Sequence, residues 1–223
     1  MSTQTIVFWI LLVLWVLSFL YGYKKSFPSS IKTKDIAVNA IFFAIILVMG
    51  FVPQVGYITI IPGLSLTLLH IPVLIGSYLY GWKKGALLGL LFGVTSWIEA
   101  LLNPTGFNAF FIYPWVSILP RVLFGILSGL FFQLLRKTPK IYANGLAVGG
   151  ISFLLTCLHT VLVFLDLFVF YPSELSALFI GGSSLVNGVT FTFLAVIALG
   201  MLGEATLSAL VVPSVGRGLQ RLI

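Results

Sequence analysis

Residues 70–137 read HIPVLIGSYLYGWKKGALLGLLFGVTSWIEALLNPTGFNAFFIYPWVSILPRVLFGILSGLFFQLLRK, and this stretch decides the fold. It holds two long apolar runs rich in glycine, separated by residues 103–114, which contain no Lys or Arg. Basic residues flank the runs at positions 83–84 and 136–137. Apolar runs of about 20 residues match the length of a helix that crosses a bilayer. The stretch therefore predicts two membrane-spanning helices joined by a turn.

The rest of the chain has the same apolar character. Of its 223 residues, 60% are hydrophobic and 8% are charged, whereas soluble domains carry about 25% charged residues. The runs are apolar on all sides, unlike the alternating strands of a membrane barrel. We expect an all-α, polytopic membrane helical bundle. Residues 34–223 would hold six core transmembrane helices, and residues 1–33 one extra N-terminal transmembrane helix with a cytoplasmic linker.

The expected boundaries follow from the apolar runs and their breakers. Residues 51–69, interrupted by proline and glycine, are expected to form an outer loop over the bundle. Counting about 20 residues back from Arg217 starts the last span near Val196 and leaves residues 173–193 as a loop or half-helix. An alternative starts it near Ser183 and leaves an interfacial tail after Glu204. The other expected helices are residues 36–52, 71–80, 85–102, 115–135 and 144–167.

The first apolar run, Ile6 to Tyr23, has two interpretations. One is a cleaved signal peptide. The other, which we favour, is a retained span with its N-terminus outside. No positive residue precedes the run and no small-residue cleavage site follows it.

The net charge of +7 is typical of nucleic-acid binding only where basic residues form a stripe. Here every Lys and Arg except Arg121 falls in one of four segments at the ends of apolar runs. The positive-inside rule assigns such segments to the cytoplasm. We therefore expect a lipid bilayer and no nucleic acid as surroundings, and a cytoplasmic C-terminus. The segments are residues 24–34, 83–84, 136–140 and 217–221.

Two charges, Glu99 and Arg121, interrupt the central apolar runs. Helical spacing places Glu99 on the face of Gly85 and Arg121 on the face of Gly125, so both face the packed interior. A charge in hydrocarbon costs about 2.5–3.5 kcal/mol on insertion scales and normally meets a partner or a cavity. One interpretation is a buried salt bridge between them. The other is a ligand site in which the planar guanidinium binds a carboxylate.

Helix counting puts these charges in the outer third of the bilayer, and Asp166 and Glu204 at a similar depth. Trp97 and Tyr113 could cover a ligand there, although aromatic residues are also the ordinary interface belt. No catalytic residue, metal site or cofactor is expected. The chain has no GxxxxGK[ST], no HExxH, no GxSxG with a partner histidine and only one cysteine. With no evident repeat either, a binding subunit that needs an external motor is favoured.

Small residues mark one face of the first core helix. Ala37, Ala40 and Ala44 recur at i, i+3 and i+7 and permit close approach of another helix. This face either packs inside the bundle or docks a partner.

Three segments carry a family resemblance. HIPVLIGSYLYGWKKGALLGLLFG (residues 70–93), PWVSILPRVLFGILSGL (residues 114–130) and GEATLSALVVPSVGRGL (residues 203–219) resemble the substrate-binding (S) components of energy-coupling factor (ECF) vitamin transporters. Ala40 and Ala44 match the small-residue motif of the family's first helix. The resemblance covers about residues 34–222, and the N-terminal run lies outside the family's usual six helices.

The resemblance implies a multi-pass protein of the bacterial cell membrane that captures a B vitamin from outside. It would dock through Ala37, Ala40 and Ala44 on a shared transmembrane scaffold subunit that carries two ATPases, and would itself be no enzyme. The sequence looks most like the pantothenate-type branch. Folate and riboflavin remain alternatives, as does a non-transport scaffold similar to the rod-shape proteins of wall assembly. The resemblance implies that Arg121 binds the vitamin carboxylate, with Asn108, Asn187 and His70 as amide and hydroxyl partners.

Overall fold

The computed structural model describes residues 33–52, 55–61, 64–104, 106–172 and 184–220. Residues 1–41 and 42–223 form two compact units, and each is treated by itself below. The predicted N-terminal span, residues 6–23, lies outside the described residues.

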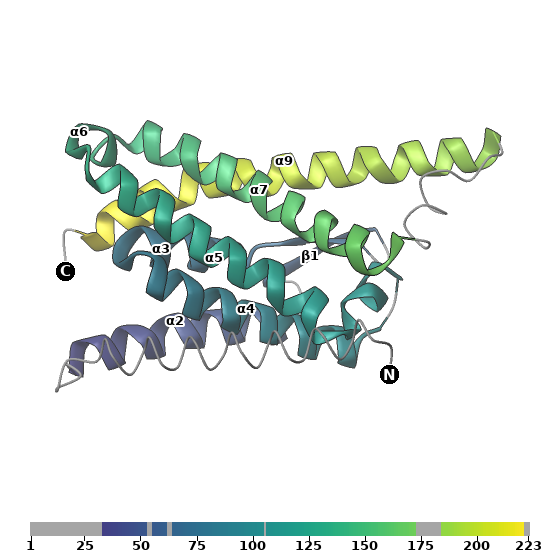
Figure 1. Ribbon diagram of the computed structural model, residues 1–223, viewed down its shortest axis with the longest axis horizontal. Helices are drawn as coiled ribbons and strands as arrows, with labels where there is room; N and C mark the ends of the chain where they lie inside the picture. The colour runs from purple at the N-terminus through teal and green to yellow at the C-terminus, as the bar shows by residue number, and fades with distance from the viewer. Residues whose placement is uncertain (1–32, 53–54, 62–63, 105, 173–183, 221–223) are drawn as a thin grey trace. The chain divides into compact units, whose positions relative to one another are not determined.

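Helices make up nearly all of the described chain (Figure 1). Four of them, α4, α5, α7 and the last part of α9, are long and apolar enough to cross a membrane. The 11 residues of α3 rise only about 17 Å, which is too short to cross alone. The described residues of the second unit thus form a helical membrane bundle. The helices are α2 (Thr33–Phe51), α3 (His70–Tyr80), α4 (Trp82–Leu102), α5 (Pro114–Arg136), α6 (Pro139–Tyr142), α7 (Gly145–Phe170) and α9 (Ser184–Gln220), with a 3₁₀ helix η1 at Gly106–Ile112.

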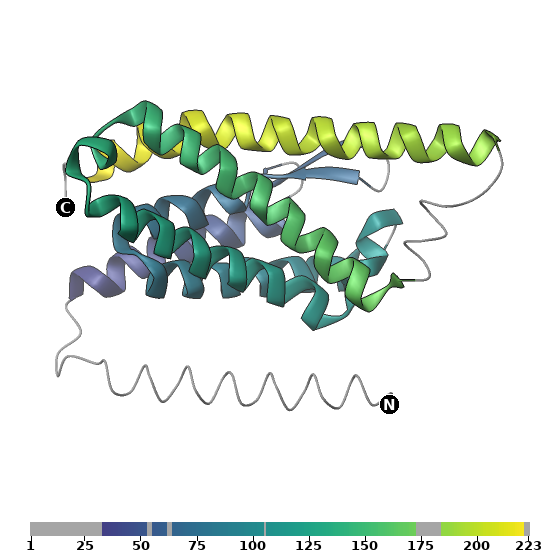
Figure 2. The same cartoon turned by 45° about the horizontal axis from the view of Figure 1, so that its top comes forward.

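The predicted outer loop contains a β-hairpin, a departure from an all-α chain. Strand β1 (Tyr57–Ile61) pairs antiparallel with β2 (Leu64–Thr67), and Tyr57 lies opposite Thr67. The strand residues are rich in β-branched side chains, which favour extended backbone. The sequence Pro62–Gly63 between them is typical of a turn. In Figure 2 the hairpin lies against α9, to which β2 is packed.

The last helix begins one residue from the alternative start near Ser183, and the part of it that could cross a membrane, Ala195–Gln220, agrees with the expected span start near Val196. Helix α9 runs from Ser184 unbroken through Pro213 to Gln220, so the interfacial tail that the alternative placed after Glu204 is absent from it. At 1.5 Å per residue its 37 residues rise about 55 Å, well beyond a hydrocarbon core of about 30 Å. Counting one bilayer thickness back from Arg217 finds the part of the helix that could cross a membrane but misses its extension to Ser184, because the helix is longer than the bilayer is thick.

Helices α4 and α5 pack with their backbones in contact (Figure 1). A Cβ atom added at Gly85 would collide with the carbonyl oxygen of Gly125, and one added at Gly89 would collide with that of Arg121. At Gly93 the added atom would lie 2.7 Å from the Cα atom of Ile118. Only glycine permits this approach, and it fixes the two helices that carry Glu99 and Arg121.

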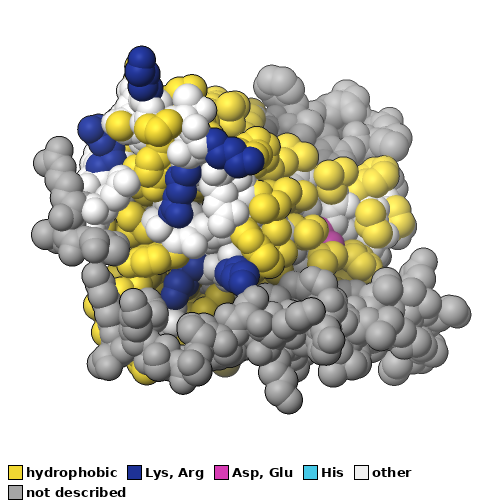
Figure 3. Space-filling view, turned by 60° about the vertical axis from the view of Figure 1, so that its left-hand side comes forward, with side chains coloured by type: hydrophobic (Ala, Val, Ile, Leu, Met, Phe, Trp, Pro, Cys, Tyr) yellow, Lys and Arg dark blue, Asp and Glu magenta, His cyan; other side chains and the backbone are white. Residues whose placement is uncertain are grey.

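Basic side chains gather at one end of the second unit, around α6 (Figure 3). Arg136 donates a hydrogen bond from Nη2 to the Tyr78 carbonyl oxygen at 2.6 Å, and the Tyr142 hydroxyl donates to the same oxygen at 3.0 Å. The Tyr78 hydroxyl donates to Oε1 of Gln220 at 3.0 Å. These bonds join the C-terminal ends of α3, α5 and α9 to α6. The basic segments at the ends of these helices therefore lie at the same end of the bundle, as the positive-inside pattern predicts.

Candidate ligand-binding cavity

A cavity of about 130 Å³ lies inside the second unit. Its wall is built from α4, η1, α5, α7, α9 and the β-hairpin. Three of the predicted ligand contacts line it: Arg121, Glu99 and Asn108. The apolar part of the wall comes mainly from α7 and α9, with Val163, Ile197 and Met201. The cavity therefore combines a few polar groups with an apolar surface, as small-molecule sites do.

Arg121 is buried, with 7% of its surface exposed. Its Nη1 donates to the Val116 carbonyl oxygen at 2.9 Å, and its guanidinium carbon lies 4.6 Å from the ring centroid of Phe111 and 5.8 Å from that of Phe92. Its Nε is buried and has no hydrogen-bond partner among the residues that the structure describes. Aromatic faces stabilise a cation electrostatically but leave its N–H donors unused. The guanidinium therefore keeps donors available for a ligand.

Pro120 explains why the Val116 carbonyl is available to Arg121. In a helix this oxygen would accept from the backbone N–H four residues later, which is Pro120, and proline has none. The guanidinium supplies the missing donor. The Pro–Arg pair thus turns the arginine back along its own helix and holds it at the cavity.

Glu99 forms no ion pair with Arg121 among the residues that the structure describes. Its Oε1 and Oε2 accept from Nδ2 of Asn108 at 3.3 and 3.1 Å, and Oε1 also accepts from Nδ2 of Asn103 at 3.5 Å. The side-chain amide of Asn108, on η1, therefore bonds the Glu99 carboxylate. The salt-bridge interpretation had given that role to Arg121. Both charged side chains line the same cavity without neutralising each other directly.

Two further carboxylates, absent from the predicted contacts, approach the guanidinium. Glu204 lines the cavity from α9, and its Oε1 accepts a hydrogen bond from the backbone N–H of Thr67. Asp166 on α7 is buried, and its Oδ2 has no partner within the described part of the chain. Both interact electrostatically with Arg121. The signal for them in the sequence is the one used for Glu99, an acidic residue inside an apolar helix.

The β-hairpin closes part of the cavity. The Tyr57 hydroxyl lies 3.0 Å from Oγ of Ser96 on α4, and both residues line the cavity together with Thr67. Burial raises the pKa of Tyr57 to about 12, so its side chain stays a neutral phenol at physiological pH. The hairpin is thus tied to α4 through a side chain and to α9 through the Thr67 backbone.

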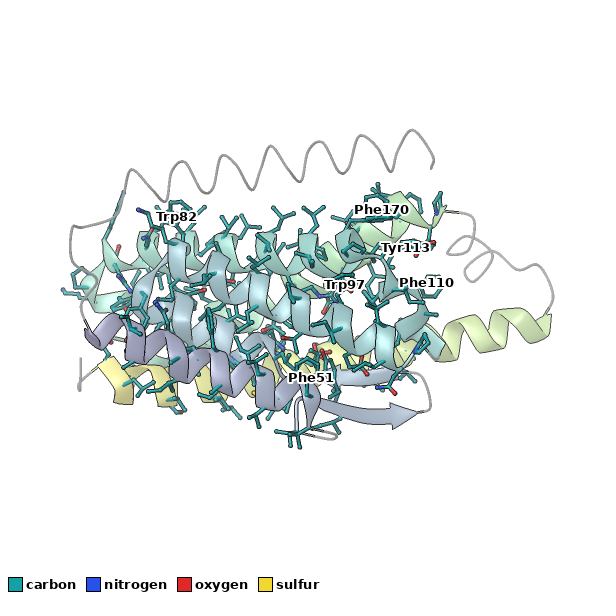
Figure 4. All side chains as sticks on the ribbon, turned by 90° about the horizontal axis from the view of Figure 1, so that it is seen from below. Phe51, Trp82, Trp97, Phe110, Tyr113 and Phe170 are labelled. Carbon is teal, nitrogen blue, oxygen red and sulfur yellow. The ribbon has the colours of Figure 1, made fainter. Side chains whose placement is uncertain are left out.

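Four other predicted contacts are placed elsewhere or are not described. His70 is fully buried, and its Nε2 lies 2.7 Å from Oγ of Ser208, away from the cavity wall. Trp97 donates from Nε1 to the Ile112 carbonyl oxygen at 2.7 Å. Tyr113 is 48% exposed and stacks on a neighbouring tryptophan, in the aromatic group near one end of the bundle (Figure 4). The side chain of Asn187 lies outside the described residues, although its backbone belongs to α9.

His159 lines the cavity, although it is not among the predicted ligand contacts. Its ring lies 6.2 Å from that of His70 and 4.8 Å from that of Phe124, measured between centroids. Its Nε2 is buried and has no hydrogen-bond partner in the described structure. The imidazole is therefore packed among aromatic rings, and its Nε2 is left without a partner among the described residues.

The small residues of α2 are exposed. Ala37 and Ala40, in the first unit, and Ala44, in the second, all have accessible surfaces. On the part of α2 that belongs to the second unit, the buried positions are Phe42, Ile46 and Gly50 instead. Ala44 therefore does not serve internal packing of that unit.

A helical membrane bundle with a partly apolar cavity and a buried guanidinium is typical of integral membrane proteins that bind a small molecule. Comparison with protein families is more specific. The chain belongs to the family of ECF transporter substrate-specific components, whose model matches residues 34–216. It is accordingly a multi-pass protein of the cell membrane and a transporter subunit.

Two curated relatives are similar over most of their length. The "Pantothenic acid transporter PanT" of Lactococcus lactis subsp. cremoris is 35% identical over 187 residues, which cover 74% of this chain and 90% of the relative. The "Pantothenate transporter PanT" of Leuconostoc mesenteroides subsp. mesenteroides is 28% identical over 137 residues, which cover 60% of this chain and 67% of the relative.

Proposed function

We propose that this chain is the pantothenate-binding S component of an ECF-type ABC importer. It captures the vitamin from outside the cell for ATP-driven uptake by a partner module. The names of both curated relatives support the substrate. The observation that carries the proposal is Arg121, a buried cation that lines the cavity and whose Nε bonds to none of the described residues.

The chemistry of pantothenate matches the cavity group by group. The vitamin has one carboxylate, an amide, two hydroxyls and a carbon bearing two methyl groups. Arg121 offers charge-assisted hydrogen bonds to the carboxylate, and such bonds are roughly twice as strong as neutral ones. The amide and hydroxyl groups find partners in Asn108, Glu99 and Glu204. The methyl groups face the apolar side chains of α7 and α9.

The proposed ligand contacts are therefore Arg121, Glu99 and Asn108 of the predicted set, joined by Glu204 and His159. The remaining predicted residues would not contact the ligand directly. In this proposal His70 and Trp97 pack behind the cavity wall, and Tyr113 lies at the membrane interface. Asn187 is retained as a contact from the early part of α9. No cofactor and no catalytic group is needed for capture.

The proposed membrane topology uses six core helices, α2, α3, α4, α5, α7 and α9, preceded by an extra transmembrane helix within residues 1–33. The basic end around α6 faces the cytoplasm by the positive-inside rule. The cavity then lies toward the outside, the C-terminus is cytoplasmic and the N-terminus is outside. Ala37, Ala40 and Ala44 form the docking face for the scaffold subunit that carries two ATPases.

Binding of the purified protein to a panel of B vitamins tests the proposal. We expect sub-micromolar affinity for pantothenate, which corresponds to a binding free energy below about −8 kcal/mol. Riboflavin has no use for the buried cation, and folate brings a second carboxylate. Preferential binding of either one would reassign the substrate. Absence of binding to every vitamin would favour the non-transport scaffold.

A further inference from the structure

The cavity wall carries more acid than base. Among the described residues that line it, Arg121 is the one permanent cation, whereas Glu99 and Glu204 both bring carboxylates. Asp166 adds a third carboxylate near the guanidinium. A ligand with one negative charge is balanced by Arg121. A ligand with further negative charge meets carboxylates and no second cation.

Glu204 differs from Glu99 in how far its acceptor capacity is used. Both oxygens of Glu99 accept from the Asn108 amide. The Glu204 side chain accepts one hydrogen bond in the described structure, from the Thr67 N–H to Oε1. A carboxylate offers about four lone-pair directions. Glu204 therefore retains acceptor capacity at the cavity, and a ligand hydroxyl or amide N–H fits it.

We propose that Glu204 is a specificity-determining residue that accepts a hydroxyl hydrogen of the substrate and restricts the site to hydroxylated monoanions. This inference rests on the proposed function and defines which form of the vitamin is accepted. A phosphate ester at the bonded hydroxyl would lose the donated hydrogen. It would also bring about 1.5 to 2 negative charges toward the Glu204 carboxylate. The site thus discriminates free pantothenate from its phosphate ester by charge, beyond any difference in size.

Isosteric substitution separates charge from size. Affinities for pantothenate and for pantothenate phosphorylated on its terminal hydroxyl are measured on purified wild-type protein and on Glu204→Gln. The wild-type protein should bind the ester about 100-fold more weakly than the free vitamin, a difference of about 2.7 kcal/mol. In Glu204→Gln this ratio should fall by about tenfold or more, because the like charge is gone and the side-chain size is kept. The glutamine carbonyl can still accept from Thr67, so the hairpin contact is preserved.

Glu99→Gln is the comparison variant: it removes the same charge from the same cavity at another proposed ligand contact, whose oxygens both accept from Asn108. It is expected to weaken the binding of both ligands together, so only the ratio of the two affinities is compared. The ratio in Glu99→Gln should change by less than about threefold. An analogue in which hydrogen replaces the terminal hydroxyl should bind wild type about tenfold more weakly than pantothenate, and should lose less in Glu204→Gln.

Each other outcome is decisive. An unchanged ratio in Glu204→Gln, with pantothenate still bound, would overturn the inference and leave the proposed function intact. An equal change in Glu99→Gln would overturn the assignment to Glu204. Failure of wild type to bind pantothenate would overturn the proposed function and this inference with it.

Discussion

The hydroxyl of Tyr57 lies 3.0 Å from Oγ of Ser96, and this contact joins the β-hairpin to α4 at the cavity that both residues line. The Tyr57 side chain therefore fastens the hairpin, which connects α2 to α3, to α4. A buried hydrogen bond of this kind contributes about 0.5–1.5 kcal/mol. Its loss should loosen the hairpin more than the bundle.

Tyr57→Phe should raise the dissociation rate of bound pantothenate about two- to tenfold while leaving the thermal midpoint of the apoprotein nearly unchanged. The ring that packs at the cavity is kept and only the hydroxyl is removed. Dissociation is followed by chasing radiolabelled vitamin with unlabelled vitamin. Tyr113→Phe, at an exposed tyrosine away from the cavity, is the control. Equal dissociation rates in both variants would show that the hairpin contact does not retain the ligand.

Arg121→Ala should weaken pantothenate binding by more than tenfold, a loss of at least about 1.4 kcal/mol, because the carboxylate then meets no cation. Arg121→Lys should recover only part of the loss, since an ammonium lacks the planar fork and does not reach the Val116 oxygen in the same geometry. Equilibrium dialysis with labelled vitamin measures both. Wild-type affinity in Arg121→Ala would remove this residue from the site.

Gly89→Ala should destabilise the protein by about 1–3 kcal/mol, because its Cβ would press on the backbone carbonyl oxygen of Arg121, which cannot swing away. Gly203→Ala on α9 is the matched control, since a Cβ there would have no neighbour within 4 Å. The control should be neutral or slightly stabilising. Thermal unfolding in detergent, followed by tryptophan fluorescence, compares them. Similar midpoints for the two variants would contradict the close packing of α4 and α5.

Ala40→Trp should abolish vitamin uptake by cells that also contain the scaffold and ATPase subunits, and leave pantothenate binding by the purified chain unchanged. A bulky indole on an exposed small residue blocks the close approach of another helix. Leu154→Trp, at an exposed position of α7, is the control and should retain uptake. Uptake by Ala40→Trp at the wild-type rate would exclude this face from docking.

Much of the bundle is predictable from the sequence, because the length of each apolar run and the charges at its ends determine where a membrane helix begins and ends. The end of α4 at Leu102 and the span of α5 agree with the apolar runs to within about two residues, as expected when a bilayer sets helix length. Placement of Glu99 and Arg121 around one cavity follows from the glycine faces. That their charges are satisfied separately, by Asn108 and by Val116, could not be predicted, since it depends on side-chain geometry between elements.

Other features depend on tertiary context that periodicity does not carry. Glu204 is recognisable as an acidic residue in an apolar helix, but its bond to the Thr67 backbone requires the hairpin to lie against α9. The hairpin itself is short. Its β-branched residues favour strands, but the prolines and glycines around them predict a loop, so the sequence alone does not decide between the two. The full length of α9 could not be predicted from bilayer thickness, because the helix extends beyond the part that could cross the membrane. The partner of His70 was likewise not predictable, because Ser208 lies on another helix 138 residues further along the chain.

The glycine contacts between α4 and α5 have a mechanical consequence for delivery of the cargo. Two helices in backbone contact cannot slide past each other or separate by small steps. The part of the cavity wall that α4 and α5 form, which carries Arg121, is therefore rigid. The hairpin, by contrast, is held by single hydrogen bonds, between Tyr57 and Ser96 on α4 and between Thr67 and Glu204 on α9, so we expect the vitamin to leave where the hairpin meets these helices. Cross-linking α4 to α5 should thus be tolerated during turnover, whereas cross-linking the hairpin to α9 should trap the vitamin inside.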